Sequence, residues 1–170
     1  TKTNPVLLSE TEVTAVRQTI RYQFPFGFIP EEHSGSPLPL QLALSRVRRG
    51  REVGLITDAF VLENFIHSVI DGLQVEKTLA TSEGEIRFLA TEHLTALNLD
   101  KTSVIRYLSA EQSNSSVVVG GSLVLKMIRR VSGGIHPYLE MGAYLTAAGY
   151  ANISPLMGSV SRVDANGTPH

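Results

Sequence analysis

The chain has 170 residues, of which 42% are hydrophobic and 18% are charged, and its formal net charge is -1. Such a chain can bury a core as one domain or two small ones, and its charge gives no reason to expect nucleic acid or an anionic membrane as a partner. The lack of cysteine excludes disulfides and thiolate metal sites. No N-terminal segment has the charged, apolar and small-residue order of a signal peptide either, so we expect a cytoplasmic protein. No apolar run approaches the roughly 20 residues of a membrane-spanning helix.

The first part of the chain predicts antiparallel strands. Ile20 to Phe28 has an apolar side chain at every second position, which is the period of a half-buried strand. Glu31 to Pro39 contains two prolines, a glycine and two serines and predicts a loop. Leu40 to Arg48 and Glu52 to Thr57 flank Arg49-Gly50-Arg51, where the glycine can adopt a positive φ, so these segments predict a hairpin.

A helix and two further strands are predicted in the middle of the chain. Asp58 is a suitable N-cap, apolar residues recur at helical spacing from Leu62 to Leu73, and Gly72 is expected to end the helix. Glu85 to Thr91 and Val104 to Leu108 follow with the period of short strands.

A polar Gln-Ser-Asn-Ser-Ser run then precedes a second predicted hairpin. Ser116 to Val119 and Ser122 to Arg130 read as apolar strands joined by Gly120-Gly121, a pair that tolerates the positive φ of a tight turn. Lys126 lies in the middle of the second strand. Because side chains alternate along a strand, its neighbours on the same face are apolar.

The last predicted elements are a helix and a strand. His136-Pro137 is suited to the first turn of a helix that runs to about Gly149, with Glu140 in its first turn, and Leu156 to Val163 predicts a final strand. The chain thus presents a polar turn, a strand with a lysine and a helix with a glutamate. In kinase-like folds, elements in this order bind ATP: the turn covers the phosphates, the lysine neutralises them, and the glutamate orients the lysine.

Two interpretations of this order remain open from the residues alone. In the functional one, backbone N–H groups and the hydroxyls of Ser113, Ser115 and Ser116 bind phosphate oxygens. In the simpler one, the segment is an ordinary hairpin whose lysine extends its ammonium into water.

A resemblance favours the functional interpretation. The segment AEQSNSSVVVGGSLVLKMIRRVSGGIHPYLEMGAYLTAAGYANISPLMG resembles the nucleotide-lobe signature of bacterial maltokinases, which reads Glu-Gln-Ser-Asn-Ser/Thr-Ser-Val, Leu-Lys, Arg-Arg, Gly-Ile/Pro-Asn-Pro-x-x-Glu and Pro-Leu-x-Gly. The segment LPLQLALSRVRRGREVGLITDAF shows a weaker similarity to the corresponding region of maltokinases fused behind a trehalose synthase. Together the resemblance covers roughly residues 20 to 160.

The resemblance implies an α+β fold in two parts. Residues 1–80 would form a partial cystatin-like cap, and residues 81–170 a kinase-like N-lobe, similar to that of aminoglycoside phosphotransferases, with an antiparallel sheet and one helix of the αC type. Carried over by position, Lys126 would be the ATP lysine and Glu140 its ion-pair partner, while His136 stands where the family usually has asparagine. The implied phosphate turn consists of Gln112, Ser113, Asn114, Ser115 and Ser116.

The resemblance also implies the chemistry. Maltokinases transfer the γ-phosphate of ATP to maltose and give maltose 1-phosphate. The catalytic aspartate and the magnesium ligands of the family belong to a C-terminal lobe, which also binds maltose. We expect this chain to lack that lobe, to begin inside the cap, and to be an inactive fragment by itself. A second reading is a non-catalytic module that serves the structure or assembly of a trehalose synthase.

Two other sites are disfavoured. His67 lies in the predicted helix without other histidine, aspartate or glutamate residues at a ligand spacing, so no metal site is assigned. The arginines of the first hairpin lack the aromatic residues that stack on nucleic-acid bases, which favours a solvated turn. These arginines are Arg46, Arg48, Arg49 and Arg51.

Overall fold

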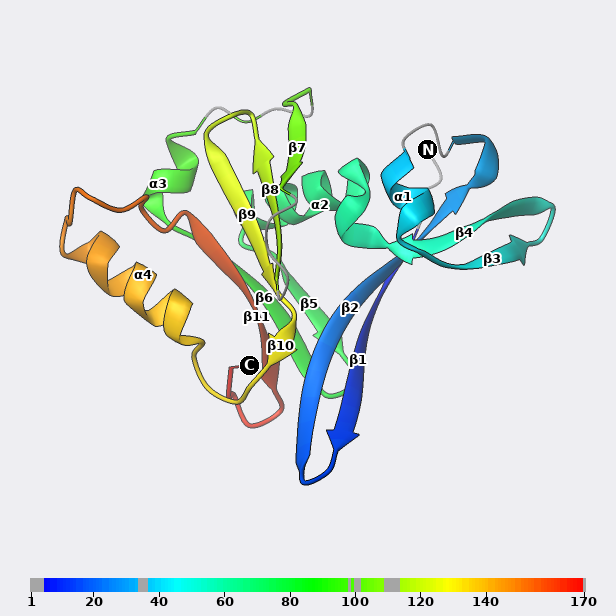
Figure 1. Ribbon diagram of the computed structural model, residues 1–170. Coiled ribbons are helices and arrows are strands. Elements are labelled where there is room, and N and C mark those ends of the chain that lie inside the picture. Colours follow the sequence, from blue (N-terminus) through cyan, green and yellow to red (C-terminus); the bar gives the residue numbers. More distant parts are fainter. Residues whose placement is uncertain (1–4, 34–36, 98, 100–101, 109–113, 170) are drawn as a thin grey trace. The chain divides into compact units, whose positions relative to one another are not determined.

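The computed structural model of the protein describes residues 5–33, 37–97, 99, 102–108 and 114–169 (Figure 1). It is a mixed α+β chain made mostly of antiparallel strands with few helices, which confirms the predicted class. Internal contacts divide the chain into two compact units. The first combines Thr1–His67 with Val104–Val131, and the second combines Ser68–Ser103 with Ser132–His170. The division into a cap of residues 1–80 and an N-lobe of residues 81–170 stays a prediction.

The first unit contains a five-stranded antiparallel sheet with the strand order β1-β2-β4-β3, in which β10 also pairs with β2. The strand predicted over Ile20 to Phe28 is the central part of β2, and the predicted hairpin around Gly50 joins β3 to β4. Gly50 has a φ of 63°, as the turn requires. The strands are β1 (Val6–Ala15), β2 (Gln18–Pro30), β3 (Ala43–Arg49), β4 (Glu52–Asp58) and β10 (Arg130–Val131).

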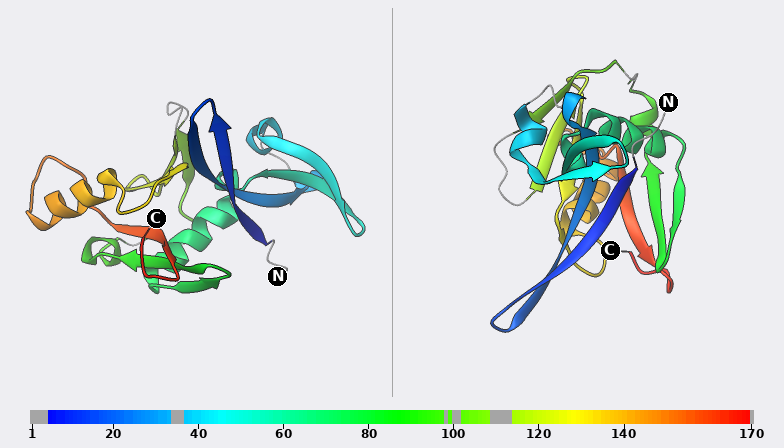
Figure 2. Two further views of the ribbon diagram at one scale, coloured as in Figure 1. Left: turned by 90° about the horizontal axis from the view of Figure 1, so that it is seen from below. Right: turned by 90° about the vertical axis from the view of Figure 1, so that its right-hand side faces the viewer.

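The β1–β2 hairpin extends well past β3 and β4 as a long twisted arm (Figure 2). The register explains this shape, because β1 pairs with β2 along its whole length, whereas β4 pairs only with residues Phe26 to Pro30. Most side chains of β1 are exposed, so this strand has no buried face of its own.

A second sheet of the first unit has three antiparallel strands in the order β7-β8-β9. β7 is Ile105–Leu108, β8 is Asn114–Val119 and β9 is Leu123–Ile128. Gly120 and Gly121 lie between β8 and β9 with φ values of 59° and 69°, which confirms the hairpin. The connection has three residues, because Ser122 belongs to the turn and Val119 pairs with Leu123, so the prediction that the second strand begins at Ser122 was wrong.

Helical segments precede and follow the strands of the large sheet. Residues Glu31–His33 form a 3-10 turn, η1, and Pro37–Gln41 form α1, so the prediction of a loop over the whole of this region was wrong at both places. Asp58 does act as an N-cap, but for the 3-10 turn η2 (Ala59–Val61), since its carboxylate accepts a hydrogen bond of 2.9 Å from the N–H of Phe60.

The long predicted helix is α2 (Glu63–Gln74), which continues past Gly72. Gly72 therefore does not end the helix. A Cβ at this position would lie 2.8 Å from the ring of Phe88, so glycine allows close contact between helix and strand. The core of the first unit is formed by buried apolar residues, namely Phe28, Leu55, Ala59, Phe60, Leu62, Ile66, Val117, Val119 and Leu123.

The second unit contains an antiparallel sheet with the order β11-β6-β5. Its strands are β5 (Thr78–Thr81), β6 (Gly84–Ala90) and β11 (Gly158–Asp164), and its helices are α3 (Glu92–Thr95) and α4 (Pro137–Ala147). The strands predicted at β6 and β11 and the helix predicted at α4 are confirmed. Among the described residues, no helix has the length and apolar character needed to cross a membrane.

Candidate functional site

The sheet β7-β8-β9 holds most of the predicted site. Leu108, the last residue of β7, pairs with Ser116 of β8, and Ser116 pairs with Lys126 of β9. These residues form one row across the sheet, and at about 4.8 Å between neighbouring strands Lys126 lies roughly 10 Å from Leu108. Lys126 is thus two strands away from the end of β7.

The predicted phosphate turn is placed only in part. Gln112 and Ser113 lie outside the described residues. Asn114, Ser115 and Ser116 are the first residues of strand β8. The prediction of a turn was therefore wrong for Asn114 and Ser115, while the strand predicted from Ser116 onward is confirmed. The role of these residues in binding phosphate stays a prediction.

Lys126 and Ser116 share one face of the sheet, since directly opposite residues of an antiparallel pair point to the same side. Ser116 is buried, Lys126 is half-buried, and Val124 on the same face of β9 is 59% exposed. The face of the sheet that carries Lys126 is therefore partly exposed to solvent, because Lys126 is half-buried while Val124 beside it is mostly exposed.

Ser115 occupies the opposite face, where it contacts Arg129. Nη2 of Arg129 donates a hydrogen bond of 2.8 Å to the Ser115 hydroxyl oxygen, and Nε donates a longer one of 3.3 Å. A serine hydroxyl that accepts from arginine keeps its own hydrogen for donation. Ser115 can therefore still donate a hydrogen bond to an anion. Its side chain lies on the core face of the sheet, however, and Lys126 lies on the opposite face.

Arg129 also forms a largely buried ion pair with Asp58. Nη2 lies 2.5 Å from Oδ2 of Asp58, and the side chains of arginine and aspartate are 11% and 22% exposed. The guanidinium carbon lies 5.9 Å from the ring centre of Phe24 and 5.6 Å from that of Phe60, so two aromatic rings contact the cation. Asp58 thus uses one oxygen as a helical cap and the other to bind arginine.

Backbone contacts fix the same region. The N–H of Gln23 donates to the carbonyl of Arg129 at 2.8 Å, and its side-chain amide donates to the carbonyl of Ile128 at 2.7 Å. The N–H of Arg129 in turn donates to Oδ1 of Asn114 at 3.4 Å. The end of β9 and the beginning of β8 are consequently attached to each other and to β2.

Sequence reasoning missed the role of Arg129, although a signal was present. The alternation that places Leu123, Leu125 and Met127 on the core face continues to position 129. An arginine in that series is a charge expected in the core, and such a charge requires a partner. The identity of the partner, Asp58, is not contained in the local pattern.

Tyr107 is a second polar residue of this core face. Its hydroxyl is buried and, among the described residues, has no hydrogen-bond partner. Burial, and to a smaller extent the negative charge of Glu63, raises the pKa of Tyr107 to about 12. The phenol is therefore neutral at physiological pH.

Glu140 lies in the first turn of α4 and is exposed. The helix begins at a cap formed by His136, whose Nδ1 accepts a 3.2 Å hydrogen bond from the N–H of Tyr138. Lys126 belongs to the first unit and Glu140 to the second, so their ion pair stays a prediction.

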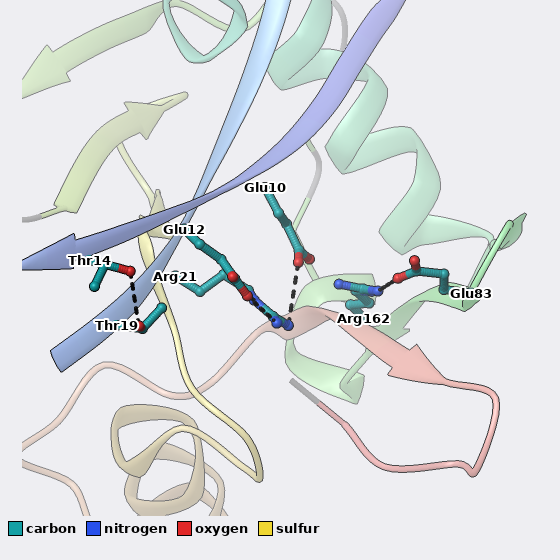
Figure 3. A network of polar contacts seen from close by, with 7 residues as sticks. All are labelled: Glu10, Glu12, Thr14, Thr19, Arg21, Glu83 and Arg162. Carbon is teal, nitrogen blue, oxygen red and sulfur yellow. Dashed lines mark hydrogen bonds and ion pairs between the residues drawn. The ribbon is translucent and has the colours of Figure 1, made fainter. Parts of the chain in front are cut away.

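Other ion pairs lie at the surface. In the β1–β2 hairpin, Arg21 approaches Glu12 at 2.7 Å and Glu10 at 3.7 Å (Figure 3). In the second unit, Arg162 lies 2.6 Å from Glu83 (Figure 3). Exposed pairs of this kind contribute about 0–1 kcal/mol, so we assign them no part in the site.

The arginine-rich hairpin is partly neutralised. Arg46 lies 2.7 Å from Glu31, and Arg49 lies 2.8 Å from Glu52. The hydrogen bond and the charge of Glu31 raise the pKa of Arg46. These carboxylates weaken any anion-binding potential at this turn.

No protein-family model matches the chain. Within the described ranges, no cluster of three or more histidine, aspartate or glutamate residues is arranged to hold a metal ion. What the geometry offers is a strand lysine opposite Ser116, in a sheet whose other face holds Ser115 against a buried arginine–aspartate pair. Chemically, such an arrangement suits the neutralisation of an anionic group.

Proposed function

We propose that this chain is the nucleotide-binding part of a maltokinase, an enzyme that transfers the γ-phosphate of ATP to maltose to give maltose 1-phosphate. In this proposal, Lys126 neutralises ATP phosphates, and the Gln-Ser-Asn-Ser-Ser run, Gln112 to Ser116, binds them. One observation carries the proposal. The row of Leu108, Ser116 and Lys126 places the lysine directly opposite the last serine of this run.

The order of the elements supports the same assignment. Kinase-like lobes place the phosphate-covering connection between the first two strands of an antiparallel sheet and the lysine on the third. β7, β8 and β9 have this order and these pairings. The proposal therefore takes α4 as the helix of the αC type, with Glu140 as the partner of Lys126, and takes residues 1–80 as a partial cystatin-like cap.

The electrostatic role of Lys126 follows from its position. A half-buried ammonium on a strand has less freedom than one on a loop, so less entropy is lost when it binds an anion. Charge stabilisation dominates phosphoryl transfer, in which negative charge is spread over the transferred group. ATP would supply that group. The proposal names no residue of the 170 for magnesium binding, the catalytic base or maltose binding, so it predicts ATP binding by the 170-residue protein and no phosphate transfer.

The test is ATP affinity, measured by isothermal titration of the 170-residue protein and of two alanine variants. Lys126→Ala removes the proposed phosphate contact, and Lys77→Ala removes an exposed lysine of the second unit as a matched control. We expect wild type and Lys77→Ala to bind ATP equally and Lys126→Ala to bind at least tenfold more weakly. Absence of ATP binding, or equal affinity of the two variants, would favour a non-catalytic module of a trehalose synthase.

A further inference from the structure

We infer that Arg129 is a positioning residue for the nucleotide site, and that it acts through Ser115 at the entrance of β8. The inference rests on the proposed function, because the site that it supports is the one assigned to Lys126 and to Asn114, Ser115 and Ser116 of the polar run. It adds a residue that has no proposed contact with the nucleotide.

The first argument is geometric. One guanidinium binds both Asp58, at 2.5 Å, and Ser115, at 2.8 Å from Nη2 and 3.3 Å from Nε. Asp58 is itself fixed by its cap hydrogen bond to Phe60. The chain from Phe60 through Asp58 and Arg129 to Ser115 therefore ties the beginning of β8 to the core of the first unit.

The second argument concerns the other end of the same contact. Asn114, the first residue of β8, accepts a hydrogen bond of 3.4 Å from the N–H of Arg129. Arg129 thus touches two consecutive residues of β8, one with its backbone and one with its side chain. Both residues belong to the Gln-Ser-Asn-Ser-Ser run and directly precede Ser116, which pairs with Lys126, so Arg129 holds the strand on which the proposed phosphate-binding serines lie.

The third argument is that stability alone does not account for an arginine here. The residue is 9% exposed, and in the described part of the chain its Nη1 is buried without a hydrogen-bond partner. Buried polar groups in structural roles are nearly always satisfied, and a buried ion pair contributes less to stability than a well-packed apolar pair often does. A role in fixing the position of Ser115 explains why the buried residue is an arginine, although its Nη1 has no hydrogen-bond partner among the described residues.

Lysine could not replace arginine in this role. The planar guanidinium presents several donors in a fixed fork, whereas an ammonium is a single point of attachment on a flexible stem. Arg129→Lys therefore keeps the positive charge next to Asp58 but loses the hydrogen bonds to Ser115. If Arg129 acts by positioning Ser115, this variant should bind ATP more weakly, whereas a role in charge pairing alone predicts no change in affinity.

The test compares ATP affinity and melting temperature for three variants of the 170-residue protein. Arg129→Lys keeps the charge. The double variant Arg129→Met with Asp58→Asn removes both charges together, while asparagine retains the cap on Phe60. Arg130→Met alters an exposed neighbour as the control. Titrations are made well below the lowest melting temperature, so that affinity refers to folded protein.

We expect Arg129→Lys and the double variant to be folded and to bind ATP at least fivefold more weakly than wild type, and Arg130→Met to bind like wild type. Amide hydrogen exchange at Ser115 and Ser116 should be faster in the first two variants, because the entrance of β8 is no longer held. Wild-type affinity in a folded Arg129 variant would overturn the inference alone. A wild-type protein that binds no ATP would instead overturn the proposed function and the nucleotide role of Arg129 together.

Discussion

The guanidinium of Arg129 lies 2.5 Å from the carboxylate of Asp58, and the two side chains are 11% and 22% exposed. This pair joins the end of β9 to the start of η2, which are far apart in the sequence. Because both charges are largely removed from water, each depends on the other far more than the exposed pairs of the β1–β2 hairpin do.

Removal of Asp58 should therefore destabilise the protein strongly. Asp58→Ala leaves a buried cation without its counter-charge and removes the cap of η2, so we expect a loss of about 3–5 kcal/mol in the free energy of unfolding. Urea denaturation followed by circular dichroism measures this loss. Glu12→Ala, which breaks an exposed pair with Arg21, serves as the control and should cost less than about 1 kcal/mol. Similar losses of unfolding free energy in both variants would show that the buried pair contributes no more to stability than the exposed pair.

Replacement of Tyr107 by phenylalanine should stabilise the protein. The phenol oxygen is buried and unpaired among the described residues, so its removal relieves a desolvation penalty, and we expect a gain of about 1 kcal/mol at neutral pH. Tyr144→Phe, at an exposed tyrosine, is the control and should leave the stability unchanged. A loss of stability in Tyr107→Phe would mean that the hydroxyl has a partner.

Tyr107 should also make stability fall at alkaline pH. Its folded pKa of about 12 lies above the ordinary value of 10, so the folded state binds the proton more tightly than the unfolded state does. The resulting stabilisation is complete below pH 10 and is lost as the pH rises from about 10 to about 12. Tyr107→Phe should show a smaller decline over this interval than wild type, as measured by urea denaturation at each pH. Equal declines would contradict the raised pKa.

Two helical glycines should respond oppositely to alanine. In Gly72→Ala the new methyl group would meet the Phe88 ring at 2.8 Å, and overpacking of this kind costs about 1–3 kcal/mol. In Gly142→Ala of α4, the nearest atom is Cδ1 of Leu156 at 3.9 Å, so the higher helix propensity of alanine should stabilise by about 0.5–1 kcal/mol. Thermal melting of the two variants gives the signs directly, and a stabilised Gly72→Ala would show that Gly72 is not a packing residue.

Local patterns predicted most regular elements. β2, β6, β8, β9 and α4 have strong periodicity and are bounded by turn residues, so their type and approximate position follow from adjacent residues. Strand β1 was not predicted, because it is an edge strand with mostly exposed side chains and lacks the alternation that burial produces.

The candidate site was predictable only in its local parts. Lys126 could be placed on a strand from the residues around it. Its pairing with Ser116 could not be derived, because the predicted two-residue turn would pair Ser116 with Leu125, whereas the observed connection includes Ser122 and shifts the register by one residue. The contact between Arg129 and Asp58 could not be derived, because it depends on how two sheets of the first unit pack. Gly72 was misread because the ring that it accommodates belongs to a strand later in the chain.

In a kinase that contains this chain, Lys126→Ala should lower kcat by about a hundredfold or more. The reason is that the lysine charge stabilises the phosphates in the transition state. The melting temperature should fall much less, because alanine leaves no buried charge on β9. Steady-state kinetics with ATP and maltose, together with thermal melting, separate the two effects. Near-normal kinetics with a collapsed melting temperature would assign Lys126 a structural role.

The most direct test of the nucleotide site is affinity labelling with an acyl-phosphate derivative of ATP, which acylates lysines that lie beside bound phosphates. The labelled lysine is identified by mass spectrometry of peptides from the 170-residue protein. We predict that Lys126 is acylated, that excess ATP prevents this, and that Lys77 reacts slowly and without protection. Labelling that ignores Lys126, or that ATP does not reduce, would contradict the assignment of the nucleotide site to this sheet.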